Sequence, residues 1–341
     1  MTQVMTVRGS IDPQDLGTTL MHEHLFIDLR HLWQQPMHEW QKPLAEADLT
    51  LGMRGLLQVD AYVSRPNLLP DDYELTVEEL APFRELGGGC IVDLTTNGIR
   101  PQPARLREVS ERSGVHIVSG CGYYTGVTHP QEVADLSEAE LIERLVQEIR
   151  DGIGGTDVRP GIIGEIGTSN PIEPNEEKVL RVAAAAQRQT GLAINVHVSI
   201  FGRRALHAID VLDAAGADLS RVVISHLDEL LDLDHHRAIL RRGCYVEYDC
   251  FGSELYYDNS GMVEPSDRER LEAITALINE GWVDRLVISH DVCTKMQLLH
   301  YGGLGYAHIL RSIVPRLKRR GVDDATVRRL LADNPARLLT V

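Results

Sequence analysis

Short apolar runs alternate with longer amphipathic segments along almost the whole chain. The short runs, expected to be β-strands, cover residues 17–20, 90–94, 116–119, 161–165, 193–197, 222–226, 245–247 and 286–289. The amphipathic segments, expected to be helices, cover residues 77–86, 103–113, 137–151, 175–189, 203–214, 230–241 and 268–280, with two more after the last strand. Eight such repeats within 341 residues are typical of a (β/α)8 barrel, whose strands are buried on both faces.

A doubly wound open sheet is the alternative fold for this alternation. The chain has no GxGxxG turn after a strand and no obvious boundary of a second domain. We therefore predict an α/β fold in which residues 1–341 form a single TIM barrel domain, with the active site at the C-terminal ends of the strands. Three irregular segments, 31–70, 250–266 and 293–306, are expected to form loops over that end.

The charge balance argues against some classes of partner. Lys and Arg number 34 against 50 Asp and Glu, a net charge of −16 without a basic tract, so neither nucleic acid nor an anionic membrane is expected to bind. No uncharged apolar run reaches the roughly 18 residues of a membrane span, and the N-terminus lacks the pattern of a signal peptide. The five cysteines occur without a CxxC spacing, as expected for free thiols. These features predict a cytoplasmic protein.

Histidines and carboxylates close several of the predicted strands. His22 and His24 are two residues apart, a spacing that points both imidazoles to one face of an extended chain. Four more such residues end or directly follow an apolar run: Glu165, His197, His226 and Asp291. These groups are costly to bury singly, so their convergence at one barrel mouth predicts a shared cation. Four imidazoles and two carboxylates suit zinc first, with manganese, cobalt or iron as alternatives. By spacing alone, His290 competes with Asp291, because adjacent residues face opposite ways.

These residues lie in segments that resemble the phosphotriesterase family of the amidohydrolase superfamily. The resemblance runs through GTTLMHEHL, GIIGEIGTS, NVHVS, VVISHLDE, SHDVCTK, YGGLGYAHIL and NPARLL, from the first strand to the C-terminus. Family members usually carry a carbamylated lysine on the fourth strand, where this chain has Glu165. That difference, together with VEYDCFGSELYYDN, makes the chain most similar to the phosphotriesterase homology proteins, in which a glutamate bridges two metals.

The resemblance implies a centre of two divalent metal ions bridged by Glu165. The other ligands that it implies are His22, His24 and Asp291 for the buried ion and His197 and His226 for the more exposed ion. It thereby favours Asp291 over His290. A glutamate and a carbamate each offer two oxygens and one negative charge, so either can span two cations.

Metal-assisted hydrolysis is the reaction that such a centre predicts, in which a metal-bridging hydroxide attacks an ester carbonyl or a phosphoryl centre. Asp291 is expected either to accept the proton of that nucleophile or to be a ligand only. Tyr124, in GCGYYTG, resembles a tyrosine that lactone-hydrolysing relatives place beside the metals, where it would orient the ring oxygen of a lactone or donate a hydrogen bond; packing near the barrel rim is the alternative. Cys250 stands where phosphotriesterases tend to have a histidine and lactonases an arginine, and we do not expect it to be a nucleophile.

The loop segments bear on the substrate. Three basic residues near the mouth of the barrel are candidates for binding a phosphate: Arg30, Lys295 and Arg203. Five aromatic residues lie in the irregular segments 31–70 and 250–266: Trp33, Trp40, Phe251, Tyr256 and Tyr257. The aromatic residues favour a neutral carboxylic ester or lactone as the small-molecule substrate, with phosphotriester hydrolysis as a side activity. Two alternatives stay open: a noncatalytic zinc-containing barrel that binds a small molecule or a protein, and a single-metal deaminase, which would need no bridging anion. The resemblance also allows a homodimer.

Overall fold

The computed structural model describes residues 2–199, 203–258 and 261–341. Within these residues the largest sheet has eight strands in the order β12-β9-β8-β7-β6-β5-β4-β3, and each neighbouring pair is parallel. The strands are β3 (Thr18–Glu23), β4 (Gly88–Asp93), β5 (His116–Cys121), β6 (Ile162–Thr168), β7 (Ile194–Val198), β8 (Val222–Ile224), β9 (Tyr245–Tyr248) and β12 (Leu286–Ile288). Each predicted strand is present, and the predicted barrel is confirmed.

The sheet curls until its edge strands, β12 and β3, meet. The amide of Asp291 donates to the carbonyl of His22 over 3.2 Å, and the amide of His22 donates to Oγ of Ser289 over 3.0 Å. Leu20 in β3 and Ile288 in β12 are fully buried, because side chains fill the barrel and helices cover its outside. Parallel strands end on the same side of a barrel, so the residues at their carboxyl ends are brought together.

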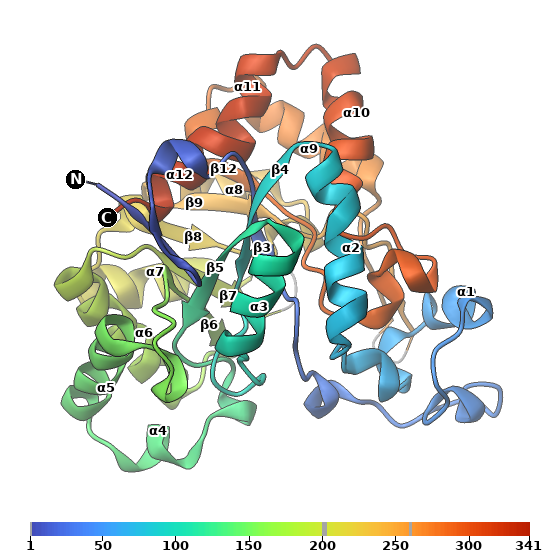
Figure 1. Cartoon of the computed structure of the whole chain (residues 1–341), viewed down its shortest axis with the longest axis horizontal. Coiled ribbons are helices and arrows are strands. Elements are labelled where there is room, and N and C mark those ends of the chain that lie inside the picture. Colours follow the sequence, from blue (N-terminus) through green and yellow to red (C-terminus); the bar gives the residue numbers. More distant parts are fainter. Residues whose placement is uncertain (1, 200–202, 259–260) are drawn as a thin grey trace.

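Helices surround the strands, as Figure 1 shows. The longer helices are α2 (Tyr73–Glu85), α3 (Pro103–Ser113), α5 (Glu138–Asp151), α6 (Pro174–Thr190), α7 (Ala205–Ala214), α8 (Leu233–Arg241) and α9 (Asp267–Asn279). Shorter helices are α4 (Gln131–Asp135), α10 (Val314–Arg319), α11 (Asp324–Arg328) and α12 (Asn334–Leu339). Local sequence fixes several ends: Ser137 and Glu140 form the capping box that begins α5, and Gly114 ends α3 in the left-handed conformation.

Two features differ from the sequence prediction. β6 continues three residues past Glu165 to Thr168, and its pairing with β7 shifts register between Ile163 and Ile166. Such a bulge leaves no mark in an apolar run, so Glu165 lies inside its strand and not at its end. A hairpin of β1 (Val4–Thr6) and β2 (Gly9–Ile11) is also present, with strands too short to show periodicity. It brings the N-terminus beside the C-terminus (Figure 1), where the amide of Gln3 donates to the carbonyl of Val341 over 2.9 Å.

The three predicted loop segments pack on one another beyond the strand ends. The first contains several short 3-10 turns and helix α1 (Arg54–Leu57), and the second contains the hairpin of β10 (Tyr256–Tyr257) and β11 (Met262–Val263). They share an apolar cluster that includes Leu57, Leu255 and Met296, one residue from each segment. In the part of the chain that the structure describes, no helix is both long and apolar enough to cross a membrane.

Candidate metal centre

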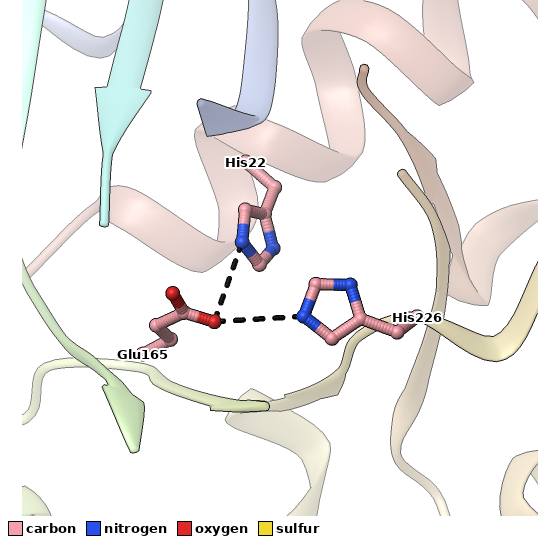
Figure 2. A group of neighbouring side chains, drawn as sticks. All are labelled: His22, Glu165 and His226. Atoms are coloured by element: carbon pink, nitrogen blue, oxygen red, sulfur yellow. Dashed lines mark ion pairs between the residues drawn. The ribbon is translucent and has the colours of Figure 1, made fainter. Parts of the chain in front are cut away.

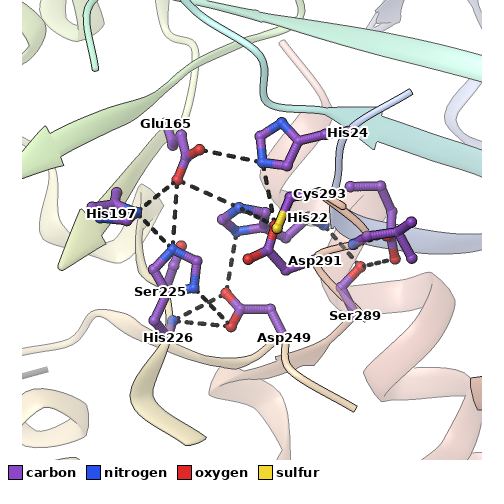
Figure 3. Close-up of polar contacts among 12 residues, drawn as sticks. His22, His24, Glu165, His197, Ser225, His226, Asp249, Ser289, Asp291 and Cys293 are labelled. Carbon is purple, nitrogen blue, oxygen red and sulfur yellow. Dashed lines mark hydrogen bonds and ion pairs between the residues drawn. The ribbon is translucent and has the colours of Figure 1, made fainter. Parts of the chain in front are cut away.

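The six predicted ligand residues converge near the carboxyl ends of five strands of the barrel. His22 lies in β3, His24 directly after it, Glu165 in β6 and His197 in β7. His226 and Asp291 follow β8 and β12, and both have left-handed backbone conformations, with φ values of 58° and 50°. Non-glycine residues adopt this conformation seldom, and here it turns each side chain toward the barrel axis. Figure 3 shows all six side chains around one point.

Glu165 stands at the centre of this group. Its Oε1 lies 3.3 Å from Nε2 of His24, and its Oε2 lies 3.1 Å from Nδ1 of His197. Oε2 also lies 3.5 Å from Nε2 of His22 and 3.6 Å from Nε2 of His226, as Figure 2 shows for these two rings. The carboxylate therefore faces four imidazoles while its side chain is 2% exposed. Its two oxygens point to different histidines, which is the arrangement that a carboxylate shared by two cations requires.

Two buried polar atoms of the group have no hydrogen-bond partner among the described residues: Nε2 of His22 and Oδ1 of Asp291. Nε2 of His22 lies 3.9 Å from Oδ1 of Asp291, and that oxygen lies 3.3 Å from Nε2 of His24. Ligand atoms of His22, His24 and Asp291 lie within 4.8 Å of one another, and the same holds for His22, Glu165 and His226. Buried polar atoms are normally paired, so unpaired nitrogen and oxygen atoms that converge like this fit a divalent cation.

The charges of the group support this interpretation. Burial lowers the pKa of His24, but Asp291 and Glu165 outweigh it and raise that pKa to about 9. Burial would raise the pKa of Glu165, but His22 and His197 hold it well below its usual value. The pKa of Asp291 is also lowered, because His24 and His22 outweigh burial. The two carboxylates are thus ionised in a buried place, and they attract either protons on the histidines or metal cations in their stead.

His290, the competitor of Asp291 by spacing, has both ring nitrogens engaged elsewhere. Its Nδ1 lies 2.7 Å from Oε1 of Glu23, and its Nε2 accepts from the amide of Ile309 over 2.9 Å. Glu23 also accepts from the amide of His290 over 3.0 Å and from that of Val292 over 3.0 Å. The buried Glu23 carboxylate therefore holds the backbone on both sides of Asp291, and the His290 ring binds the same carboxylate.

Sequence reasoning missed two buried carboxylates behind the histidines, Glu247 in β9 and Asp249 directly after it. Oδ2 of Asp249 lies 3.1 Å from Nδ1 of His22, and Oδ1 lies 3.1 Å from Nδ1 of His226. Oε2 of Glu247 lies 3.4 Å from Nδ1 of His22. The signal was present in VEYD, where acidic residues two apart at the end of an apolar strand share one face.

A cavity of about 310 Å³ opens above the centre. Tyr124, Cys250 and Tyr257 line it together with Glu165 and Asp291, and residues of all three loop segments contribute to its walls. The ring of Tyr124 packs edge to face against His197, with centroids 4.8 Å apart. Burial and the charge of Glu165 raise the pKa of Tyr124 well above its usual value, so its hydroxyl is a neutral donor.

The predicted substrate contacts are only partly present. Of the five aromatic residues expected over the site, Tyr257 lines the cavity, whereas Trp33 donates its indole N–H to the carbonyl of Val63 and lines a neighbouring cleft. Phe251 is buried, and Trp40 and Tyr256 are exposed away from the described lining. Among the described residues, none of the three basic candidates lines this cavity; Arg30 pairs with Asp28 in the neighbouring cleft. The lack of periodicity located the loops that carry the aromatic residues, but it could not show where their side chains point.

Comparison with known proteins agrees with this geometry. The model of the phosphotriesterase family matches residues 2–339. An N-acetyltaurine hydrolase of Xenopus tropicalis is 40% identical over 344 residues, which cover 99% of this chain and 98% of the relative.

Solved structures of high similarity include a resiniferatoxin-binding protein from Rhodobacter sphaeroides. It is 39% identical, with a TM-score of 0.96 over 99% of this chain and 94% of that chain. The phosphotriesterase homology protein from Escherichia coli, complexed with phosphate in its active site, is 31% identical, with a TM-score of 0.80 over 96% of this chain and 100% of that chain. The matched family, the barrel and the clustered ligand residues agree with one another. This chain therefore belongs to the phosphotriesterase family of hydrolases.

Proposed function

We propose that this chain hydrolyses a carboxylic acyl bond of a small molecule with two divalent cations, zinc in the first place and manganese, cobalt or iron as alternatives. One cation would be held by His22, His24 and Asp291, the other by His197 and His226, and Glu165 would bridge them. The bond that we favour is the amide of an N-acyl amine, because relatives that match 99% of the chain, such as those of Xenopus tropicalis and Homo sapiens, are named N-acetyltaurine hydrolases. The ester or lactone predicted from the sequence differs from it in the leaving atom only.

The position of Glu165 is the observation that carries this proposal. Its carboxylate lies within 3.1 to 3.6 Å of nitrogens from four histidines and is almost completely buried. A single-metal deaminase needs no anion at this place, and structural zinc sites are usually closed sets rich in cysteine. The donor set here contains imidazoles and carboxylates and faces an open cavity, which favours catalysis over a purely structural role.

Bound at these residues, the cations would supply a water of lowered pKa and polarise the oxygen of the acyl carbonyl. The chain itself must move protons and orient the substrate. Asp291 borders both His24 and the cavity and is ionised, so its carboxylate can accept the proton of the attacking water. An amide nitrogen leaves only when it is protonated, and Asp291 can pass that proton on as the carbon–nitrogen bond breaks.

Tyr124 is positioned to assist this reaction. Its hydroxyl lies 3.5 Å from both ring nitrogens of His197, too far for a strong bond to either, and it borders the cavity. The neutral phenol therefore has its proton available for the carbonyl oxygen, where negative charge develops.

The walls of the cavity bear on which leaving groups are accepted. Glu229 and Glu264 line it, and among the described residues no Lys or Arg does. A sulfonate such as that of N-acetyltaurine gains no ion pair from these walls, so we propose that the acyl group is recognised at the centre and that neutral leaving groups are also accepted. A panel of substrates that differ in charge distinguishes these cases.

The experiment compares wild type, Glu165→Gln and Glu79→Gln, the last a buried glutamate outside the centre that accepts from the amides of Leu299 and His300. N-acetyltaurine, a neutral N-acetyl amine, a γ-lactone and a neutral phosphotriester are offered before chelation, after chelation and after zinc is restored. We expect acyl hydrolysis by wild type and Glu79→Gln that chelation abolishes and zinc restores, and a loss of at least a hundredfold in Glu165→Gln. Turnover that survives chelation would contradict the proposal, and metal-loaded protein without turnover of any substrate would favour the noncatalytic binding barrel.

A further inference from the structure

Asp249 connects the two halves of the proposed centre from behind. It follows β9, opposite Glu165, and its side chain is fully buried. Figure 3 shows its carboxylate between His22 and His226, which come from β3 and from the turn after β8. Those histidines are assigned to different cations in the proposed function, so a single residue contacts a ligand of each.

The two oxygens of Asp249 are divided between the two rings. Oδ2 lies 3.1 Å from Nδ1 of His22, and Oδ1 lies 3.1 Å from Nδ1 of His226. A carboxylate can only accept, so each ring carries its proton on Nδ1 and turns the lone pair of Nε2 toward Glu165. The amide of His226 donates to the same carboxylate, over 3.1 Å to Oδ1 and 3.0 Å to Oδ2, which also fixes the backbone of that ligand.

Asp249 is itself held in place by a second buried carboxylate. The amides of Asp249 and Cys250 donate to Oδ1 and Oδ2 of Asp228, over 3.1 and 3.0 Å. Asp228 in turn lies 3.1 Å from Nε of Arg270, which is fully buried in α9. These bonds fix the backbone at Asp249, whereas its carboxylate is oriented by the groups that it contacts, His22 and His226.

Glu247 offers a matched comparison. Its Oε2 lies 3.4 Å from Nδ1 of His22 and accepts from the side chains of Asn195 and Ser225, over 2.8 and 3.0 Å. Within the described residues it contacts no ligand of the second cation. It supports one half of the centre, whereas Asp249 supports both.

We propose that Asp249 is a positioning residue that couples the two metal sites, so that filling one site favours filling of the other. A cation on His22 fixes that ring against Oδ2 and thereby holds Oδ1 where His226 needs it, and the reverse holds for a cation on His226. Partners behind metal-ligating histidines typically change metal affinity by about 10- to 100-fold. This inference rests on the proposed function, because it presupposes two cations.

The test uses binding of Co²⁺ and Zn²⁺ to the metal-free full chain, measured by chelator competition and by the visible spectrum of Co²⁺. Asp249→Asn leaves one accepting oxygen, and the amide group that replaces the other oxygen would set its N–H groups against the Nδ1–H of the second ring. We expect Asp249→Asn to weaken one site by about 10- to 100-fold and to abolish coupling between the sites. Glu247→Gln should weaken the His22 site alone and keep the coupling. Asp249→Asn that binds two ions with wild-type affinity and coupling would overturn the inference, as would equal effects of the two variants.

A measurement on the wild type guards against a variant that does not fold. In zinc-loaded protein labelled with ¹⁵N-histidine, nuclear magnetic resonance should show His22 and His226 both protonated on Nδ1, and either ring protonated on Nε2 would overturn the inference. Wild-type protein that binds fewer than two ions would contradict the proposed function itself. Two bound ions in wild type with unaltered coupling in Asp249→Asn would contradict this inference alone.

Discussion

Glu165 shows how one residue sets the character of the centre. Its carboxylate is part of the genetically encoded side chain, so this chain needs no modified lysine to place two oxygens between the histidines. The lowered pKa of Glu165, which His22 and His197 maintain against burial, keeps both oxygens available as acceptors. Glu165→Gln keeps the shape of the side chain but removes its negative charge, and two neighbouring cations would require that charge.

Tyr124 carries a prediction at the same scale. Tyr124→Phe removes the hydroxyl but keeps the ring against His197, so metal content should stay unchanged. We expect kcat to fall by about 10- to 100-fold with little change in KM, because the lost donor acts on charge that develops during the reaction. Steady-state kinetics with Tyr62→Phe, a second cavity-lining tyrosine, as the control checks this. An unchanged kcat would leave Tyr124 with a packing role only.

The raised pKa of Glu148, in α5, should make the free energy of unfolding depend on pH. Burial raises the pKa of Glu148 from 4.5 to about 7. Between pH 4.5 and pH 7, the Glu148 carboxyl is therefore protonated in the folded protein but ionised in the unfolded chain. The contribution of Glu148 to the free energy of unfolding therefore declines as the pH rises from about 4.5 to about 7. Glu148→Gln removes this decline and should gain up to about 3 kcal/mol at pH 8. Urea unfolding between pH 4.5 and 8 measures it, with Glu143→Gln, exposed on the same helix, as control; parallel pH curves for wild type and Glu148→Gln would contradict the prediction.

Residue types and spacing predicted the six inner side chains, because each lies at or near the end of an apolar run. They did not predict Asp249 or the contacts of Trp33. Those depend on where a side chain points after the strand has ended, and three-dimensional packing decides that direction. His226 and Asp291 show the same limit, since their left-handed conformations have no signature in the letters around them.

At the scale of elements, one contact has two effects. The contact between β3 and the end of β12 closes the barrel, and it also positions residues of the candidate metal centre. Glu23 is the last residue of β3 and accepts from four groups of the segment after β12: Oγ of Ser289, the amide and ring of His290, and the amide of Val292. These bonds hold Asp291 in its left-handed conformation. The prediction of the strands located this junction, but the hydrogen bonds across it required the structure.

Glu23→Ala tests the junction. It leaves several buried donors without an acceptor, so we expect a loss of about 3 kcal/mol in the free energy of unfolding of the metal-free protein, together with weaker metal binding at Asp291. Denaturant unfolding and metal titration measure the two effects. Glu108→Ala, exposed on α3, should change stability by less than about 0.5 kcal/mol. A Glu23→Ala protein as stable as wild type would show that the other contacts between β3 and β12 suffice.

The alternation of strands and helices was enough to predict the elements of the barrel, because strands buried on both faces read as continuous apolar runs. The length of β6 was not predictable, since the register shift at its centre depends on its pairing with β7. The loop segments were located by their lack of periodicity. Their internal turns, and the cluster of Leu57, Leu255 and Met296 that joins them, are tertiary features.

At the scale of the whole molecule, the centre ties together strands from opposite sides of the barrel, so metal binding should stabilise the fold. Each site filled at about a thousand times its Kd contributes about 4 kcal/mol, which for a chain of 341 residues is a rise in Tm of roughly 5 °C per site. Calorimetry of chelated and zinc-restored protein measures this rise. Glu165→Gln should lose most of it, and an equal Tm with and without zinc in the wild type would contradict this account.

Anomalous X-ray diffraction from zinc-loaded crystals tests the central claim, that Glu165 stands between two cations, most directly. Data collected on both sides of the zinc absorption edge should give two peaks per chain, one beside His22, His24 and Asp291 and one beside His197 and His226, with the carboxylate of Glu165 between them. A single peak, or two peaks with Glu165 bound to neither or to one alone, in crystals of protein that hydrolyses its substrate would contradict the account.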